Sequence, residues 1–261
     1  MEEKSGATFW DHLDVLRFAL LRSVVLITVL SVTAFCFKEF VFEGIILAPA
    51  KNDFFVFRFF EFISQKFGIK DFNLDIQPIK IINTKLSAQL FIHLSASFYL
   101  GFIAAVPSIL GEIWFFLKPA LYKNEQKLTI KALIFMTVLF YSGVLTSYFL
   151  IFPLSVNFLA NYQVTSGVEN LIDLDSYIDT LTSLTLSLGI VFEIPVLSYF
   201  LSKIGILSYK FMKNHRKHAF VLVLIAAAII TPGTDIFTML LTAMPLQLIY
   251  ELSVRIVKKN E

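Results

Sequence analysis

Length, composition and charge already exclude several classes of protein. The chain has 261 residues, of which 57% are hydrophobic and 16% charged. Soluble domains are closer to half apolar and a quarter charged. The net charge of +2 is too small for a surface that binds nucleic acid, and the single cysteine, Cys36, can form neither an intrachain disulfide nor a cysteine cluster for a metal. The chain is therefore predicted to be an integral membrane protein with no metal site and no cofactor.

Six apolar stretches are candidates for membrane spans, because a bilayer core about 30 Å thick needs roughly 20 helical residues. They cover about 18–37, 86–107, 132–152, 178–202, 219–231 and 236–250. Pro107 ends the second and Pro153 the third. The last two stretches are only 13 and 15 residues long, so we expect the bilayer to thin around them.

The first stretch is interpreted as a span and not as a removable signal peptide, because it ends in bulky phenylalanines and further apolar stretches follow. Arg22 lies one turn inside it, where a long side chain can reach back to the headgroups.

The distribution of Lys and Arg predicts the orientation. Fifteen of them fall on the side of the N-terminus, the loops 108–131 and 203–218 and the C-terminal tail, whereas seven fall on the other side, all within 38–85. Both termini are therefore expected in the cytoplasm. Residues 38–85 are expected to form a folded, Phe-rich cap on the outer face, and residues 1–261 a single membrane domain.

Glu193 lies inside the fourth stretch, about 20 Å from its outer end. A carboxylate at such depth costs roughly 2.5–3.5 kcal/mol if it faces lipid. Pro195 cannot donate a hydrogen bond to the carbonyl of Val191, so a kink beside Glu193 is expected. Glu193 is interpreted either as a protonated side chain bonded to a neighbouring helix or as a site for a partner or substrate. His93, in the second stretch, could transfer protons or be a bonded residue of the bundle.

Residues 111–125 mix aromatic side chains with two carboxylates on the expected cytoplasmic side. The first part, with apolar residues at helical spacing, predicts a short helix in the membrane interface that stops at Pro119. A rigid carboxylate can bind an arginine guanidinium through two parallel hydrogen bonds. Without further information, Glu125 could equally be a solvated charge beside Lys123 and Lys127.

Several segments resemble the TatC family, the receptor subunit of the twin-arginine protein translocase. The matching segments are His12-Leu13 with Leu16-Arg17, Ala48-Pro49, Phe116-x-x-Pro119-Ala120-Leu121-Tyr122-x-x-Glu125, Phe149–Phe152 with Pro153-Leu154, Phe192-Glu193-x-Pro195, Thr231-Pro232 with Asp235, and Pro245 with Glu251. They follow one another in the family's order from His12 to Glu251.

The resemblance implies an all-α bundle of six transmembrane helices, cupped around a concave face lined by Glu193 and Pro195. It implies a signal-peptide site made of Leu16, Arg17, Phe116, Pro119, Leu121, Tyr122 and Glu125, with Pro49 and Asp235 as structural residues of the outer face. It further implies export of folded proteins driven by the proton-motive force, with TatA- and TatB-like single-span proteins, signal peptides with consecutive arginines and other copies of the chain as partners in the bilayer.

Two positions depart from the family pattern. The N-terminal acidic position is Val15, with Asp14 one residue earlier, which rotates a helical carboxylate by about 100°. The glutamine expected four residues after Asp235 is Met239, which puts the polarity of that helix in doubt.

The predicted function is recognition of twin-arginine signal peptides and assembly of a translocation complex, without enzymatic activity. The alternative function is that of a proton-coupled secondary transporter, in which Glu193, alone or together with His93, relays protons. Such transporters are commonly built from repeated halves, and no repeat is visible in the chain. An intramembrane enzyme is disfavoured because the sequence offers no nucleophile with a base at membrane depth.

Overall fold

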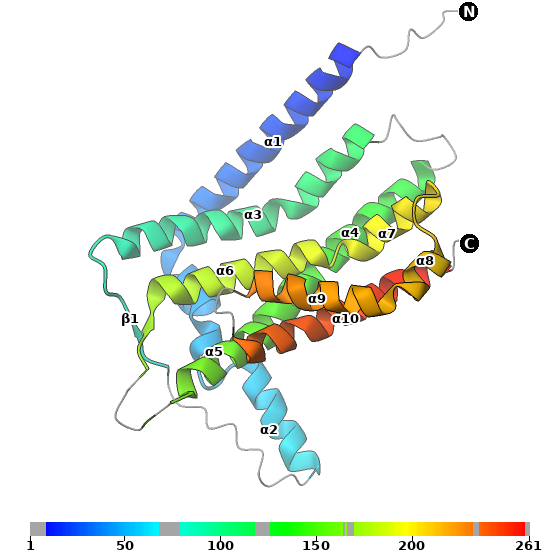
Figure 1. Cartoon of the computed structure of the whole chain (residues 1–261). Coiled ribbons are helices and arrows are strands. Elements are labelled where there is room, and N and C mark those ends of the chain that lie inside the picture. Colours follow the sequence, from blue (N-terminus) through cyan, green and yellow to red (C-terminus); the bar gives the residue numbers. More distant parts are fainter. Residues whose placement is uncertain are drawn as a thin grey trace, which may run out of the picture. The chain divides into compact units, whose positions relative to one another are not determined.

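The computed structural model describes residues 9–67, 79–117, 126–163, 165, 170–231 and 235–258 (Figure 1). Side chains are not described for residues 9–12, 67, 117, 126–131 and 258. Four residues of the expected signal-peptide site, Pro119, Leu121, Tyr122 and Glu125, therefore lie outside the described residues.

The described chain is built from helices, joined by short irregular segments and two very short strands. The α-helices are α1 (Phe9–Cys36), α2 (Phe55–Phe67), α3 (Ala88–Leu117), α4 (Gln126–Thr146), α5 (Phe152–Asn161), α6 (Leu174–Val191), α7 (Ile194–Lys203), α8 (Tyr209–Asn214), α9 (Arg216–Ile230) and α10 (Ile236–Lys258). Two π-helical turns, η1 (Phe40–Ile46) and η4 (Ser147–Ile151), and a 3-10 turn, η2 (Ala48–Ala50), lie between them. Strand β1 (Ile81–Ile82) pairs in parallel with β2 (Ile172–Asp173).

Two compact units divide these elements. Unit 1 comprises Met1–Phe37 and Leu94–Val138, and unit 2 comprises Lys38–His93 and Leu139–Glu261. Unit 1 thus contains α1 and most of α3. Unit 2 contains the segment after α1, α2 and everything from the end of α4 onward.

Five helical segments of the described chain are long and apolar enough to cross a membrane. They are Leu13–Cys36, Ala88–Phe116, Ala132–Asn161, Leu174–Lys203 and Ile236–Val257. The remaining predicted stretch, the fifth (219–231), corresponds to α9, which has only 15 residues. The fold is therefore that of an all-α polytopic membrane protein, as predicted, with α9 as the short segment.

Three predicted ends need correction, because the helices continue through the residues that were expected to stop them. Pro107 lies inside α3, which runs on to Leu117, so the expected interfacial helix is the last part of α3 instead. Membrane helices tolerate such a proline because neighbouring groups satisfy the freed carbonyl.

Pro153 does not end the third segment either. The π-helical turn η4 precedes it, and the amide of Phe152 donates to the carbonyl of Ser147, five residues back. Pro153 has no amide proton to donate, and the wider turn before it accommodates this loss. The helix α5 therefore continues to Asn161.

The last helix was expected to end near Tyr250, but α10 continues to Lys258. The charge that interrupts the apolar stretch, Glu251, forms an ion pair with Arg216 of α9 at 2.7 Å. The helix tolerates this carboxylate because it is paired. Placing the end of the helix at the first charged residue was therefore wrong.

Close packing of α4 on α6 fixes part of the core of unit 2. A Cβ atom at Gly143 would lie 2.6 Å from the Leu188 carbonyl oxygen and 2.8 Å from Cγ of Phe192. Only a glycine allows the two helices this close, as is common where membrane helices cross. The contact holds α4 against the last turn of α6, directly before Glu193.

The segment after the first span is attached to two membrane helices in the part that the structure describes. Tyr148 of η4 donates a hydrogen bond to the Ile45 carbonyl at 2.6 Å, and Tyr177 of α6 donates to the Ile46 carbonyl at 2.9 Å. Both carbonyls belong to the end of η1, so two membrane helices fix the position of this turn.

Candidate functional site

Glu193 lies at the break between α6 and α7. The amide of Phe192 still donates to the Leu188 carbonyl at 2.9 Å, whereas the amide of Glu193 donates to Ile190, three residues back, at 3.0 Å. Glu193 is the residue before α7, and Pro195 stands in the first turn of that helix. The kink predicted from Pro195 is confirmed, and it places Glu193 at a helix junction inside the apolar segment Leu174–Lys203.

The carboxyl group of Glu193 is buried without a hydrogen-bond partner. Both carboxylate oxygens are inaccessible to solvent, and neither has a partner within the part of the chain that the structure describes. Its neighbours Phe192, Pro195 and Val196 are buried, with exposures of 6% for Phe192 and 3% for Val196. Burial of a polar group without a hydrogen bond costs free energy, so this carboxyl gains most from a polar group supplied by another molecule.

Unit 1 carries the described part of the expected signal-peptide site. On α1, Arg17 is exposed and Leu16 is half-buried. Phe116, also half-buried, is the last residue of α3 whose side chain is described. Asp14, the displaced acidic residue, is exposed on α1.

Arg22 and Glu112 form an ion pair that the sequence did not predict. A guanidinium nitrogen of Arg22 lies 2.8 Å from a carboxylate oxygen of Glu112, and the two side chains are 64% and 18% exposed. Arg22 was expected to reach the headgroups, but it binds α3 instead. Glu112, the other carboxylate of residues 111–125, thus has an arginine partner within unit 1.

Arg216 and Glu251 form the corresponding pair of unit 2, between α9 and α10. Beside them, the Tyr250 hydroxyl donates to the Met212 carbonyl of α8 at 2.8 Å. The family pattern pointed to Glu251 but gave no partner for it. The only sequence signal for this pair was the presence of opposite charges on two helices that follow each other in the chain.

Asp235 caps α10, because one of its carboxylate oxygens accepts a hydrogen bond from the amide of Thr238 at 2.7 Å. Pro49 is buried in the turn η2. Met239, which replaces the expected glutamine, packs against the apolar cluster of Ala227, Ala243 and Leu246. The helix therefore contributes an apolar contact at that position.

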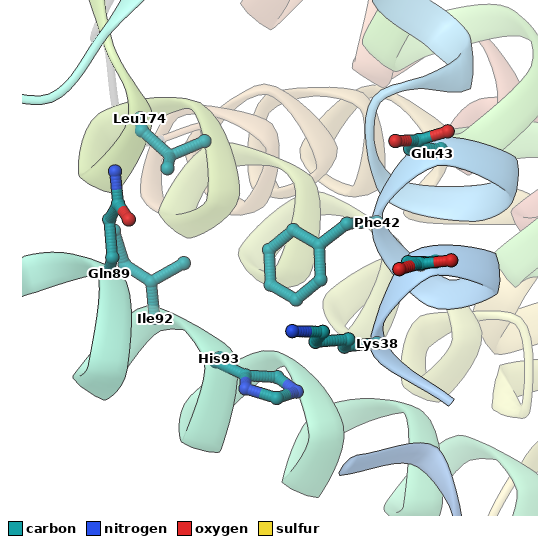
Figure 2. A pocket seen from close by; sticks show the side chains of 8 residues that line it. Lys38, Phe42, Glu43, Gln89, Ile92, His93 and Leu174 are labelled. Carbon is teal, nitrogen blue, oxygen red and sulfur yellow. The ribbon is translucent and has the colours of Figure 1, made fainter. Parts of the chain in front are cut away.

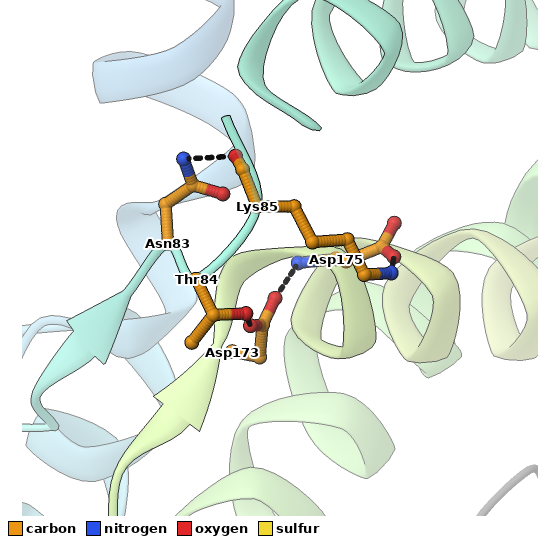
Figure 3. Close-up of polar contacts among 5 residues, drawn as sticks. All are labelled: Asn83, Thr84, Lys85, Asp173 and Asp175. Atoms are coloured by element: carbon orange, nitrogen blue, oxygen red, sulfur yellow. Dashed lines mark hydrogen bonds and ion pairs between the residues drawn. The ribbon is translucent and has the colours of Figure 1, made fainter. Parts of the chain in front are cut away.

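A polar clasp joins the segment before α3 to the start of α6 (Figure 3). Lys85 forms an ion pair with Asp175 at 2.7 Å, and the Thr84 hydroxyl donates to the carboxylate of Asp173. Asp173 also accepts a hydrogen bond from the Asp175 amide at 3.0 Å and so caps α6. The Thr84 hydroxyl, followed by that amide, lowers the pKa of Asp173, and the hydrogen bond to Asp175 raises the pKa of Lys85.

His93 lines a cavity of about 260 Å³ in unit 2, together with charged residues that follow α1. Figure 2 shows the ring of Phe42 and the side chain of Lys38 next to His93, and the two rings lie edge to face with centroids 5.5 Å apart. Glu39 and Glu43 line the same cavity. Because Glu193 has no hydrogen-bond partner among the described residues, no direct hydrogen bond links it to His93.

These features define a multi-pass helical membrane protein with a buried carboxyl group at a helix break, without a hydrogen-bond partner among the residues that the structure describes. The model of the family "Sec-independent protein translocase protein (TatC)" matches residues 11–245. The chain belongs to the TatC family.

Relatives and solved structures agree over nearly the full chain. The TatC protein of Blattabacterium sp. subsp. Periplaneta americana (strain BPLAN) is 36% identical over 97% of this chain and 96% of its own length. That of Aquifex aeolicus (strain VF5) is 31% identical over 94% of this chain and 92% of its own length. A crystal structure described as the twin arginine translocase receptor TatC superposes with a TM-score of 0.72 at 32% identity, covering 95% of this chain and 98% of that one.

Proposed function

We propose that this chain binds twin-arginine signal peptides at the cytoplasmic face of a bacterial-type inner membrane. It then assembles with TatA- and TatB-like single-span proteins, and with further copies of itself, to export folded proteins using the proton-motive force. The observation that carries the proposal is the buried carboxyl of Glu193, which has no partner among the described residues of a TatC-family chain. The solved relatives are described as twin arginine translocase receptors, which supports the same assignment.

The first step concerns specificity. Glu125 binds an arginine of the signal peptide, while Leu16, Phe116 and Leu121 contact its apolar residues and Arg17, Pro119 and Tyr122 shape the surface. A bidentate contact between a carboxylate and a guanidinium cannot be reproduced by a lysine ammonium. Glu112 has a smaller role in this step, because Arg22 already binds it at 2.8 Å.

The second step takes place within the membrane. A polar side chain of a partner helix, or of the inserted signal peptide, forms a hydrogen bond with Glu193. Water does not compete for this bond at membrane depth. Once the bond forms, the carboxyl group is no longer an unsatisfied polar group. Pro195 keeps the helix open at this residue. The chain performs no chemical reaction of its own in this account.

The direct test of the receptor function compares two peptides. A detergent-solubilised sample should crosslink to a signal peptide with consecutive arginines and not to the same peptide with two lysines. Equal crosslinking of both peptides would contradict recognition through the guanidinium groups.

A second experiment separates partner docking from the proton relay of a transporter. Glu193→Gln keeps a donor and an acceptor but cannot titrate, whereas Glu193→Ala has neither. Docking predicts that the glutamine variant exports protein and the alanine variant does not. A relay predicts that both variants are inactive, and normal export by the alanine variant would leave Glu193 with a structural role alone.

A further inference from the structure

The helix α2, in the segment between the first two spans, presents an aromatic stripe that the other described residues leave uncovered. Phe55, Phe59 and Phe62 are spaced by four and three residues and so share one face. Their side chains are 63%, 49% and 62% exposed. Three large aromatic side chains in one continuous exposed row are unusual on a surface that faces water.

The opposite side of the first turn is held in the protein. Val56 and Phe57 are buried, with exposures of 3% and 1%. The ring of Phe54 stacks on that of Phe149 with centroids 5.6 Å apart, and Phe55 contacts the same ring edge to face at 6.0 Å. The helix is thus fixed at its N-terminal end, and the exposed stripe is not the result of an unattached segment.

The contact with Phe149 places the start of α2 at the lipid-facing surface of a membrane helix. Phe149 lies in the apolar segment Ala132–Asn161, and it and Leu150 are 37% and 38% exposed. In Figure 1, α2 runs across the direction of α9 and α10, which also belong to unit 2. The aromatic stripe of α2 therefore adjoins the lipid-facing surface of Ala132–Asn161 and extends it sideways.

The remaining faces of α2 suit a helix in the membrane interface. Glu61 is exposed away from the stripe, Arg58 and Gln65 are exposed along its flank, and Lys66 lies at the C-terminal end with its ammonium 5.9 Å from the centroid of the Phe62 ring. A long cationic side chain beside an inserted aromatic ring can extend to the headgroups. An apolar face opposite a polar face is the pattern of helices that lie in the bilayer surface.

We propose that α2 lies in the interfacial layer of the bilayer, with Phe55, Phe59 and Phe62 inserted between the phospholipid headgroups and the upper part of the acyl chains. The occupant of the stripe is the lipid itself. The helix then anchors the segment between the first two spans to the same leaflet that surrounds η4. This inference does not depend on signal-peptide binding.

Site-directed spin labelling tests the proposal. Cys36, the single cysteine, is replaced by serine, and one nitroxide is attached to Phe59→Cys or Phe62→Cys in the full chain, reconstituted in vesicles of phosphatidylcholine and phosphatidylglycerol. Glu61→Cys, on the polar side of the same helix, is the matched control. All three positions are exposed, so the labels should not disturb the core.

We expect oxygen, which concentrates in lipid, to relax the labels at positions 59 and 62 more strongly than a water-soluble nickel chelate does, and the reverse order at position 61. Equal access of the chelate to all three positions would show that the stripe faces water and would overturn the proposal. Protection of positions 59 and 62 from both reagents would also overturn it, because protein, such as a second copy of the chain, would then cover the stripe.

Discussion

Two kinds of carboxyl group occur in the apolar helices of this protein, and they differ in their partners. At the ends of helices, Glu112 and Glu251 each bind an arginine of the neighbouring helix, at 2.8 and 2.7 Å. At the break between α6 and α7, Glu193 is more deeply placed and has no partner among the described residues. The carboxyl groups that have a partner within the chain are therefore those closer to water, although water could also have solvated them there.

This difference separates structural carboxylates from a docking site. An ion pair within the chain uses the hydrogen-bonding capacity of its carboxylate and so contributes mainly to the fold. The buried carboxyl of Glu193 retains its full capacity, and a partner that satisfies it removes a free-energy cost that the isolated chain has to bear. Substitutions at these positions test whether the paired carboxylates serve the fold and the other carboxyl groups serve binding of another molecule.

The largest effect is expected at Glu125, the second carboxylate that we assign to another molecule. Loss of a charge-assisted hydrogen bond costs roughly 1.5–3 kcal/mol, about ten- to a hundred-fold in affinity. Glu125→Ala and Glu125→Gln should therefore both weaken binding of an Arg-Arg signal peptide by this factor, measured by titration of a labelled peptide. Glu61→Gln, an exposed carboxylate of α2, is the control, and unchanged affinity in both Glu125 variants would make Glu125 an ordinary surface charge.

The position of the helix break should be sensitive to the packing of α4. Gly143→Ala places a methyl group 2.6 Å from the Leu188 carbonyl oxygen and close to Phe192, so the break beside Glu193 has to shift. We expect a loss of about 1–3 kcal/mol in stability, measured by thermal unfolding in detergent, and reduced export.

Gly111→Ala is the matched control, because its methyl group would meet nothing within 4 Å. In a helix interior this substitution is expected to be neutral or to stabilise by about 0.5–1 kcal/mol. Equal behaviour of the two variants would show that the contact between α4 and α6 does not constrain the break.

The paired carboxylates should behave as a stability element of modest size. Arg216 and Glu251 are 44% and 31% exposed, so solvent screens their interaction and about 0.5–1 kcal/mol is expected. A double-mutant cycle with Arg216→Gln and Glu251→Gln, read by thermal unfolding, should give a coupling free energy of this size with signal-peptide affinity unchanged. A loss of peptide affinity in Glu251→Gln would show that Glu251 is not merely structural.

The smallest effect concerns pH and the clasp of Figure 3. The pKa of Asp173 is lowered in the folded protein, chiefly by the Thr84 hydroxyl, so its contribution to stability is present above the unfolded pKa, about 3.9, and disappears as the pH falls through the folded value. The difference in unfolding temperature between the parent and Asp173→Asn should therefore shrink as the pH falls below about 4. Asp179→Asn, on the same helix, serves as the control, and a difference independent of pH would contradict the assignment.

The sequence predicted the architecture well where a helix depends on its own residues. Long apolar stretches identified the spans, and Pro195 identified the break beside Glu193. The error at Pro153 arises because a π-helical turn precedes the proline, and the error at Tyr250 arises because a charge on another helix pairs with Glu251. At Pro107 the helix α3 continues through the proline.

The candidate site was predictable in part for the same reason. The depth of Glu193 follows from its position in one apolar stretch, whereas Arg22 and Glu112 are separated by 90 residues and nothing in their local sequence links them. The clasp of Thr84 and Lys85 with Asp173 and Asp175 spans a similar distance. Such pairs appear only when packing brings two helices together.

The central claim is that another polypeptide satisfies the carboxyl group of Glu193 within the membrane. Photocrosslinking from Leu197, which is 56% exposed one turn after Glu193, tests it directly in membranes that contain the single-span partners and a twin-arginine substrate. The account predicts a crosslink to a partner helix or to the signal peptide that persists in Glu193→Gln and is lost in Glu193→Ala. An equally strong crosslink in the alanine variant would contradict the account.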